Sequence, residues 1–70
     1  MNLTVNGKQA TIDGRETLTV TDLLGELKVL QPDFVTVELN GEILERKDFD
    51  SILVEDGHSV EFLYLMGGGQ

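Results

Sequence analysis

The chain has 70 residues, with thirteen acidic against five basic side chains, for a formal net charge of −8 at pH 7. A chain of this length forms one small domain with little room for an enclosed catalytic cavity, which disfavours a stand-alone enzyme. The acidic balance argues against nucleic acid as a partner, because phosphates are neutralised by lysine and arginine. It fits either a basic partner surface or simple solubility.

The chain contains no cysteine and a single histidine, His58. A disulfide, a thiol nucleophile and a cluster of histidine ligands are therefore ruled out. His58 falls in a turn over residues 55–58 and is expected to be exposed to solvent, without a catalytic or metal-binding role. Neither a signal-peptide pattern nor a membrane-spanning run is visible, so we expect a cytoplasmic protein without membrane contact.

A hairpin is predicted at the start of the chain. Leu3 and Val5 alternate with polar residues, as in a strand with one buried face. Asn6-Gly7 is a strong hairpin signal, since both residues tolerate positive φ. The returning strand is expected over residues 8–13.

A short helix is predicted to begin at Thr19, with Asp22 placed to complete a capping box. Apolar residues then recur at helical spacing and form one stripe, made of Val20, Leu23, Leu24 and Leu27. Gly25 weakens the middle of this helix, so we expect it to be short. Pro32 prevents its continuation, and Gln31 before the proline is expected to be extended.

The most regular strand is predicted over residues 34–39, with Val35, Val37 and Leu39 on one face. A second Asn-Gly turn leads to a short strand over residues 42–44. The charged segment 46–52 is expected to form a short helical or 3-10 turn that lays Phe49 and Ile52 on the core.

The last strand is expected over residues 59–65. Two sets of apolar residues alternate along it: Val60, Phe62 and Tyr64 on one face, and Leu63 and Leu65 on the other. Three glycines follow shortly afterwards. The domain is therefore expected to cover residues 1–66, with a flexible glycine-rich tail at 67–70, because glycine gives up the most backbone freedom on ordering.

This order of elements predicts an α+β fold of the β-grasp (ubiquitin-like) type. We expect a mixed sheet of four to five strands, with one main helix across one face and a short 3-10 or helical turn. The first and last strands are expected to be parallel neighbours in the middle of the sheet.

Several stretches, taken in order, resemble the ThiS family of sulfur carriers, which are ubiquitin-like β-grasp proteins related to MoaD. They are the start NLTVNGK, the capped TVTDLL, the strand and turn VTVELNGEIL with Arg46 after it, and the ending VEDGHSVEFLYLMGGG. Each stretch alone is weak, but their combination over essentially the whole chain is specific.

The resemblance implies a carrier that is not itself an enzyme and that binds no cofactor of its own. In the family, a ThiF-like enzyme uses ATP, with Mg, to adenylate the C-terminal glycine carboxylate. A sulfur donor then displaces AMP and leaves a thiocarboxylate, which a thiazole synthase-like acceptor uses in thiamine biosynthesis. A segment without side chains suits this chemistry, because its backbone can enter a narrow site on another protein.

The chain departs from the family pattern at Gln70, which masks the glycine carboxylate. The resemblance implies that a JAMM-type peptidase removes Gln70, leaving Gly69 as the reactive residue and Gly68 as the second glycine. A cut after Gly68 is an alternative. Gln70 also leaves open a carrier for methionine or cysteine biosynthesis and, with an inert terminus, a non-catalytic β-grasp binding module. A ubiquitin-like modifier is a further alternative, because it uses the same activated glycine carboxylate.

Docking residues are expected near this tail, in a protein that is monomeric when free. They are Leu63, Leu65, Met66 and Gly67, with Arg46 either joining them or pairing with a neighbouring acid such as Glu42. Gly7 and Gly41 are expected to serve turns, since no phosphate-loop spacing is present. Asp48 and Asp50 are two residues apart, so on a helix they would not face each other as an acid–base pair.

Overall fold

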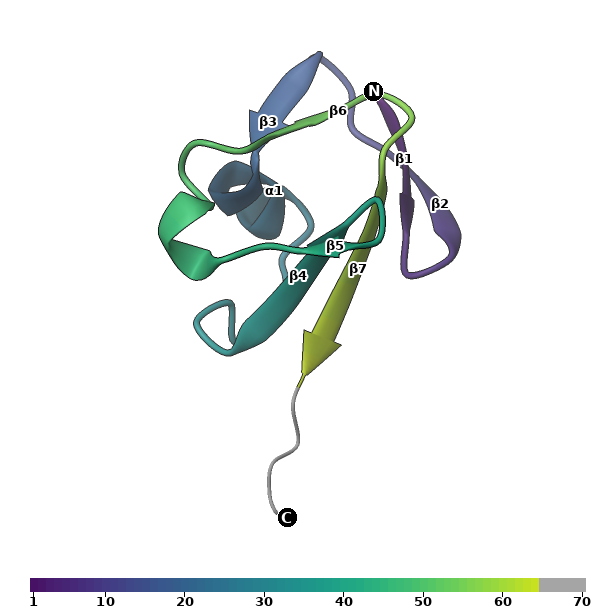
Figure 1. Cartoon of the computed structure of the whole chain (residues 1–70). Coiled ribbons are helices and arrows are strands. Elements are labelled where there is room, and N and C mark those ends of the chain that lie inside the picture. The colour runs from purple at the N-terminus through teal and green to yellow at the C-terminus, as the bar shows by residue number, and fades with distance from the viewer. Residues whose placement is uncertain (65–70) are drawn as a thin grey trace.

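A five-stranded mixed sheet, a short helix across one of its faces and a separate pair of strands make up the fold (Figure 1). The computed structural model describes residues 1–64. The strand order is β2-β1-β7-β4-β5. In this sheet β1 (Asn2–Val5) runs parallel to β7 (Ser59–Tyr64), and the other pairs are antiparallel. The predicted β-grasp arrangement is confirmed, including the pairing of the first strand with the last.

Both Asn-Gly dipeptides form the predicted two-residue turns. The first joins β1 to β2 (Lys8–Thr11), and the second joins β4 (Val35–Leu39) to β5 (Glu42–Ile43). The asparagines have φ of 50° and the glycines 82° and 86°. Positive φ at both positions is what a type I′ turn requires, so its twist matches that of the flanking strands.

The two turn asparagines also attach their hairpins to the central strand. Asn6 Oδ1 accepts a 2.8 Å hydrogen bond from the Phe62 amide, and Asn40 Oδ1 accepts one of 2.8 Å from the Ser59 amide. Each turn therefore caps a backbone N–H of β7 beyond the regular pairing. This holds the strand that leads to the C-terminal residues from both sides.

The helix α1 (Val20–Glu26) begins where the capping pattern predicted. Thr19 is the N-cap, and its hydroxyl oxygen accepts a 3.1 Å hydrogen bond from the Asp22 amide. The Asp22 carboxylate does not complete the box and instead lies 3.9 Å from the Arg15 guanidinium. At seven residues the helix is as short as Gly25 suggested.

A left-handed residue ends the helix. Lys28 has φ of 54°, its amide donates to the Gly25 carbonyl, and the Val29 amide donates to the Leu24 carbonyl. This is the Schellman pattern, in which the left-handed position is usually glycine. A lysine there keeps the hydrogen bonds but carries the steric cost of its Cβ.

Two short strands were missed by the sequence prediction. Strands β3 (Thr17–Thr19) and β6 (Leu53–Glu55) pair as a separate antiparallel sheet on the far side of α1 from β4 (Figure 1). The predicted 3-10 turn is present as η1 (Arg46–Asp48). Phe49 after it is buried, and Ile52 packs against the core, as expected.

The core lies between the five-stranded sheet, α1 and the small sheet. Its buried hydrophobic residues are Leu3, Ile12, Leu18, Val20, Leu23, Leu24, Val35, Val37, Phe49, Val54 and Val60. In residues 1–64 no polar or charged side chain is buried. The interior of this part of the chain therefore holds no acid, base or nucleophile, and any chemistry must involve the surface or the C-terminal residues.

Candidate functional site

The residues predicted to react, to be removed or to dock a partner divide into two groups. Gly69, Gly68, Gln70, Gly67, Met66 and Leu65 lie outside the residues that the structure describes. Leu63 and Arg46 lie inside them, on β7 and η1. The structure therefore describes the surface around the end of β7, which directly precedes the C-terminal residues in the sequence.

Leu63 lies on the face of the sheet away from the helix. It is paired with Thr36 of β4 and is 40% exposed, whereas Val60 on the other face is buried. Glu61 shares the open face, because alternate residues of a strand point the same way. Leu63 is thus an apolar side chain that is free for contact near the end of β7.

Tyr64 ends the described part of β7 and lies on the helix side of the sheet. It pairs with Val35 and is 43% exposed, so it lies at the edge of the core. Its hydroxyl donates a 2.6 Å hydrogen bond to the Leu30 carbonyl. This bond joins the end of β7 to the loop between α1 and β4.

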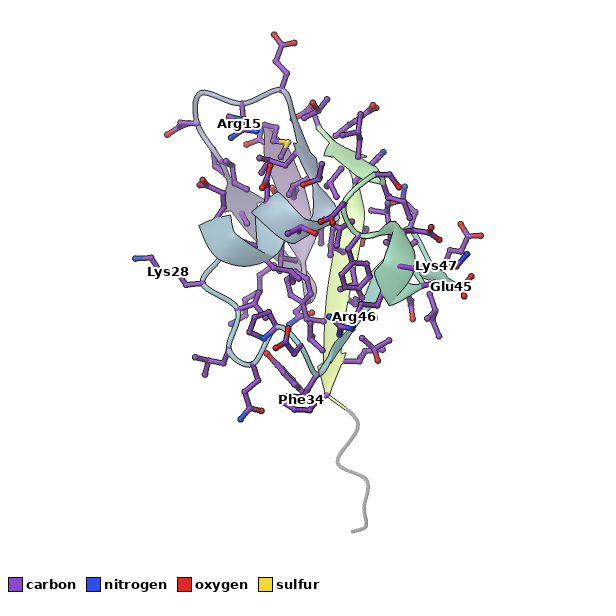
Figure 2. All side chains as sticks on the ribbon, turned by 90° about the vertical axis from the view of Figure 1, so that its left-hand side faces the viewer. Arg15, Lys28, Phe34, Glu45, Arg46 and Lys47 are labelled. Carbon is purple, nitrogen blue, oxygen red and sulfur yellow. The ribbon has the colours of Figure 1, made fainter. Side chains whose placement is uncertain are left out.

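Four exposed apolar residues lie near this end of the sheet, with Leu63 and Tyr64 on opposite faces of β7, and we call them the exit rim: Leu30, Phe34, Leu63 and Tyr64. Leu30 is tied to Tyr64 by the hydrogen bond above, and Phe34 directly precedes Val35, the partner of Tyr64. Figure 2 shows Phe34 where β4 begins and β7 finishes. Exposed apolar clusters of this kind commonly mark interaction sites.

Leu63 is the only member of the exit rim that was predicted as a docking residue, and Tyr64 was placed on the face of the last strand with Val60 and Phe62. Phe34 was assigned to a strand over residues 34–39, but β4 starts at Val35 and Phe34 is 73% exposed. Leu30, at 78%, was given no role. The available signal was Pro32 between them, because a proline-containing turn holds its neighbours at the surface.

The loop that carries these residues is tightly turned. The Phe34 amide donates to the Gln31 carbonyl over 2.9 Å, with Pro32 at the second position of the turn, where its fixed φ is favoured. Gln31 has φ of 50°, so the expectation of an extended residue before the proline was wrong. With Lys28, two non-glycine residues of this one loop adopt the left-handed conformation.

Arg46 holds the same loop from the other side. Its guanidinium donates to the Pro32 carbonyl over 2.9 Å and to the Val35 carbonyl over 2.7 Å, and lies 5.0 Å from the centre of the Phe49 ring. Figure 2 shows Arg46 between η1 and the start of β4. No ion pair with Glu42 is found within residues 1–64, so the predicted pairing is wrong.

Arg46 is therefore a structural bridge between η1 and the loop. A planar guanidinium with several fixed donors can serve two carbonyls and stack on a ring at once, which an ammonium group cannot do. Its donors are engaged inside the chain, so a direct role in docking is less apt for Arg46 than for Leu63.

The remaining polar candidates have local roles. His58 is half-buried, contrary to expectation, and its Nδ1 accepts a 3.1 Å hydrogen bond from the Glu55 amide. Asp50 accepts a hydrogen bond from the Thr21 hydroxyl, which links the segment after η1 to α1. Within residues 1–64 no three histidine, aspartate or glutamate side chains are grouped as metal ligands. The helices of this part are all too short to cross a membrane.

The chain combines a β-grasp sheet with a run of glycines after its final strand, and this combination is typical of small ubiquitin-like proteins. The model of the ThiS family matches residues 3–69. The chain therefore belongs to the ThiS family, as its resemblance predicted.

Solved structures agree with this membership. The crystal structure of a thiamine biosynthesis protein (ThiS) from Geobacter metallireducens has 67% identity and a TM-score of 0.94, covering 99% of this chain and 100% of that one. An NMR solution structure of a thiamine biosynthesis protein from the same organism has 66% identity and a TM-score of 0.79, covering 100% of this chain and 90% of that one.

A curated relative has a different size. A thiazole synthase of Paramagnetospirillum magneticum is 36% identical over 69 residues, which are 99% of this chain but 20% of that protein. The chain thus spans about a fifth of the length of this relative, and a similar sequence is joined there to a much longer polypeptide.

Proposed function

We propose that this chain is a sulfur carrier whose reactive group is the carboxylate of Gly69, and that its sulfur serves thiazole formation in thiamine biosynthesis. The observation that carries the proposal is the family match, which runs from the first strand through Gly69. The names of the solved neighbours support the pathway.

The chemistry takes place in two steps. A Gly69 carboxylate oxygen attacks the α-phosphorus of ATP, pyrophosphate leaves, and an acyl adenylate forms. A sulfur nucleophile at the oxidation level of sulfide then attacks the carbonyl carbon, the bond to the AMP oxygen breaks, and a thiocarboxylate remains. Adenylation is needed because a free carboxylate is a poor electrophile, whereas AMP is a good leaving group.

The chain itself supplies the group that is transferred and the surface that partners hold. A ThiF-like enzyme would bind ATP with Mg, and a separate donor would provide the sulfur. The match to the ThiS family supports a carrier rather than a catalyst. Leu63 on the open face is the described residue best placed to dock such an enzyme beside the C-terminal residues.

Gln70 must be removed before this chemistry can start. We propose that a JAMM-type peptidase hydrolyses the bond between Gly69 and Gln70. The family match extends to Gly69 and stops there, which supports this cut over one after Gly68. A thiazole synthase is the proposed acceptor, supported by the relative of that name.

Intact-mass spectrometry tests the function. The form ending at Gly69 is incubated with ATP, an active ThiF-like enzyme and a sulfur donor, and we expect the mass change for one oxygen replaced by sulfur. The chain that retains Gln70 is the matched control and should be unchanged. Absence of the change in the Gly69 form, with the same enzyme active on its own carrier, would refute the proposal.

A further inference from the structure

The loop between α1 and β4 presents two large apolar side chains to solvent. Leu30 and Phe34, at 78% and 73%, are more exposed than any other large hydrophobic residue in the described part of the chain. Residues 28–34 contain one lysine and one aspartate, so this loop is neutral in a chain of net charge −8. A neutral loop with exposed apolar tips suits contact with an apolar partner surface.

The loop is held in place rather than left loose. Tyr64 binds the Leu30 carbonyl from the end of β7, and Arg46 binds the Pro32 and Val35 carbonyls from η1. Gln31, between Leu30 and Pro32, is left-handed, and the contacts on either side of it hold this local strain. A contact surface that is fixed before binding loses less entropy when the partner arrives.

The position of the loop restricts which proteins can reach it. Gly69 lies five residues beyond Tyr64, and a chain of that length spans at most about 18 Å. A protein that holds the Gly69 carboxyl group in its active site must therefore bring its own surface close to the exit rim.

Resting on the proposed function, we propose that Leu30 and Phe34 form the contact by which the sulfur-accepting thiazole synthase recognises this carrier, and that Arg46 and Tyr64 are positioning residues for that contact. A thiazole synthase is the partner that the comparisons supply, since a similar domain is part of a chain of that name. A second copy of this chain is disfavoured, because each copy carries a net charge of −8.

Two faces are available at the end of β7. Leu63 and Tyr64 are consecutive in the strand and point to opposite faces. Leu63 on the open face is available to the activating enzyme, and the Leu30–Phe34 side is available to the acceptor.

Binding of the form ending at Gly69 to a thiazole synthase, measured by titration calorimetry, tests the contact. We expect Leu30→Ser and Phe34→Ser each to weaken binding at least about tenfold, as truncation of a central interface residue does. Ile43→Ser is the matched control, because Ile43 is 64% exposed on the edge strand β5, away from the exit rim. It should bind like the unaltered chain.

The positioning role is tested by a double-mutant cycle. Tyr64→Phe keeps the ring but removes the bond to the Leu30 carbonyl, and we expect it to weaken binding severalfold while the Leu30 side chain is intact. In the Leu30→Ser background the same change should have little further effect, because the contact it positions is gone. Combined with Ile43→Ser, it should keep its full effect.

Three results separate the possibilities. Unchanged affinity of both serine variants, with circular dichroism showing that they are folded, overturns the proposed contact. If the serine variants bind the acceptor normally but are loaded with sulfur more slowly by the ThiF-like enzyme, the loop is a contact for that enzyme, and the proposed contact with the acceptor is also overturned. Failure of the form ending at Gly69, without other substitutions, to become a thiocarboxylate refutes the proposed function instead, and intact mass reports that independently.

Discussion

Replacing Arg46 with alanine should remove much of the stability of this small domain. The change deletes the hydrogen bonds to the Pro32 and Val35 carbonyls and the stacking on Phe49. A hydrogen bond to a charged group contributes about 1.5–3 kcal/mol. The bond from Arg46 to the Pro32 carbonyl is exposed and the bond to the Val35 carbonyl is only partly buried, so each contributes less than this. We therefore assign about 1.5 kcal/mol to the two bonds together.

The contact with the ring adds about 0.5 kcal/mol at an exposed site, which brings the expected loss to about 2 kcal/mol. A domain of this size has roughly 3–5 kcal/mol in total, so about half of the free energy of unfolding is at stake. The melting temperature should fall by roughly 8–16 °C, at about 4–8 °C per kcal/mol.

Urea unfolding followed by far-ultraviolet circular dichroism measures this loss. Lys47→Ala is the matched control, because Lys47 is a neighbouring exposed cation on η1 with no side-chain partner among residues 1–64. It should change the stability by less than about 0.5 kcal/mol. Arg46→Lys should recover only part of the lost stability, because an ammonium group cannot bond both carbonyls and stack on the ring as the planar guanidinium does. Equal effects of Arg46→Ala and Lys47→Ala would refute the bridging role.

Three further predictions follow from the described contacts. Lys28→Gly should raise the free energy of unfolding by about 1 kcal/mol by relieving the left-handed strain at the helix end. Lys28→Ala, which keeps the Cβ, should give no such gain in the same urea titration. Asn6→Gly should lower the free energy of unfolding by about 1 kcal/mol, because it removes the acceptor for the Phe62 amide. Asn6→Asp keeps an acceptor oxygen and should lose less stability. Equal losses for the two variants would show that this hydrogen bond contributes nothing. Leu63→Ser should leave stability within about 0.5 kcal/mol but slow thiocarboxylate formation in a timed mass assay, and an unchanged rate would remove Leu63 from the docking surface.

The features that could be predicted from the sequence are those encoded by neighbouring residues. Both Asn-Gly turns, the Thr19 cap and the apolar stripe of α1 are local signals, and each appears in the structure. The parallel pairing of β1 with β7 followed from the order of elements, because the β-grasp topology leaves few alternatives.

The missed features depend on contacts between distant segments. Strands β3 and β6 have three residues each and are strands only because they pair across 34 or more positions of the chain. The partners of Arg46 are backbone carbonyls, which have no signature in the sequence. Phe34 was overlooked because an apolar residue beside a predicted strand is normally assigned to that strand, and Leu30 lies between the predicted helix and that strand, where no pattern assigns it to either.

The intact mass of the protein isolated from its native cells, grown without added thiamine, tests the central claim most directly. We predict a population that ends at Gly69, part of which has one carboxylate oxygen replaced by sulfur. A population that retains the residue after Gly69 throughout and carries no sulfur, in cells that are making thiamine, would contradict the account.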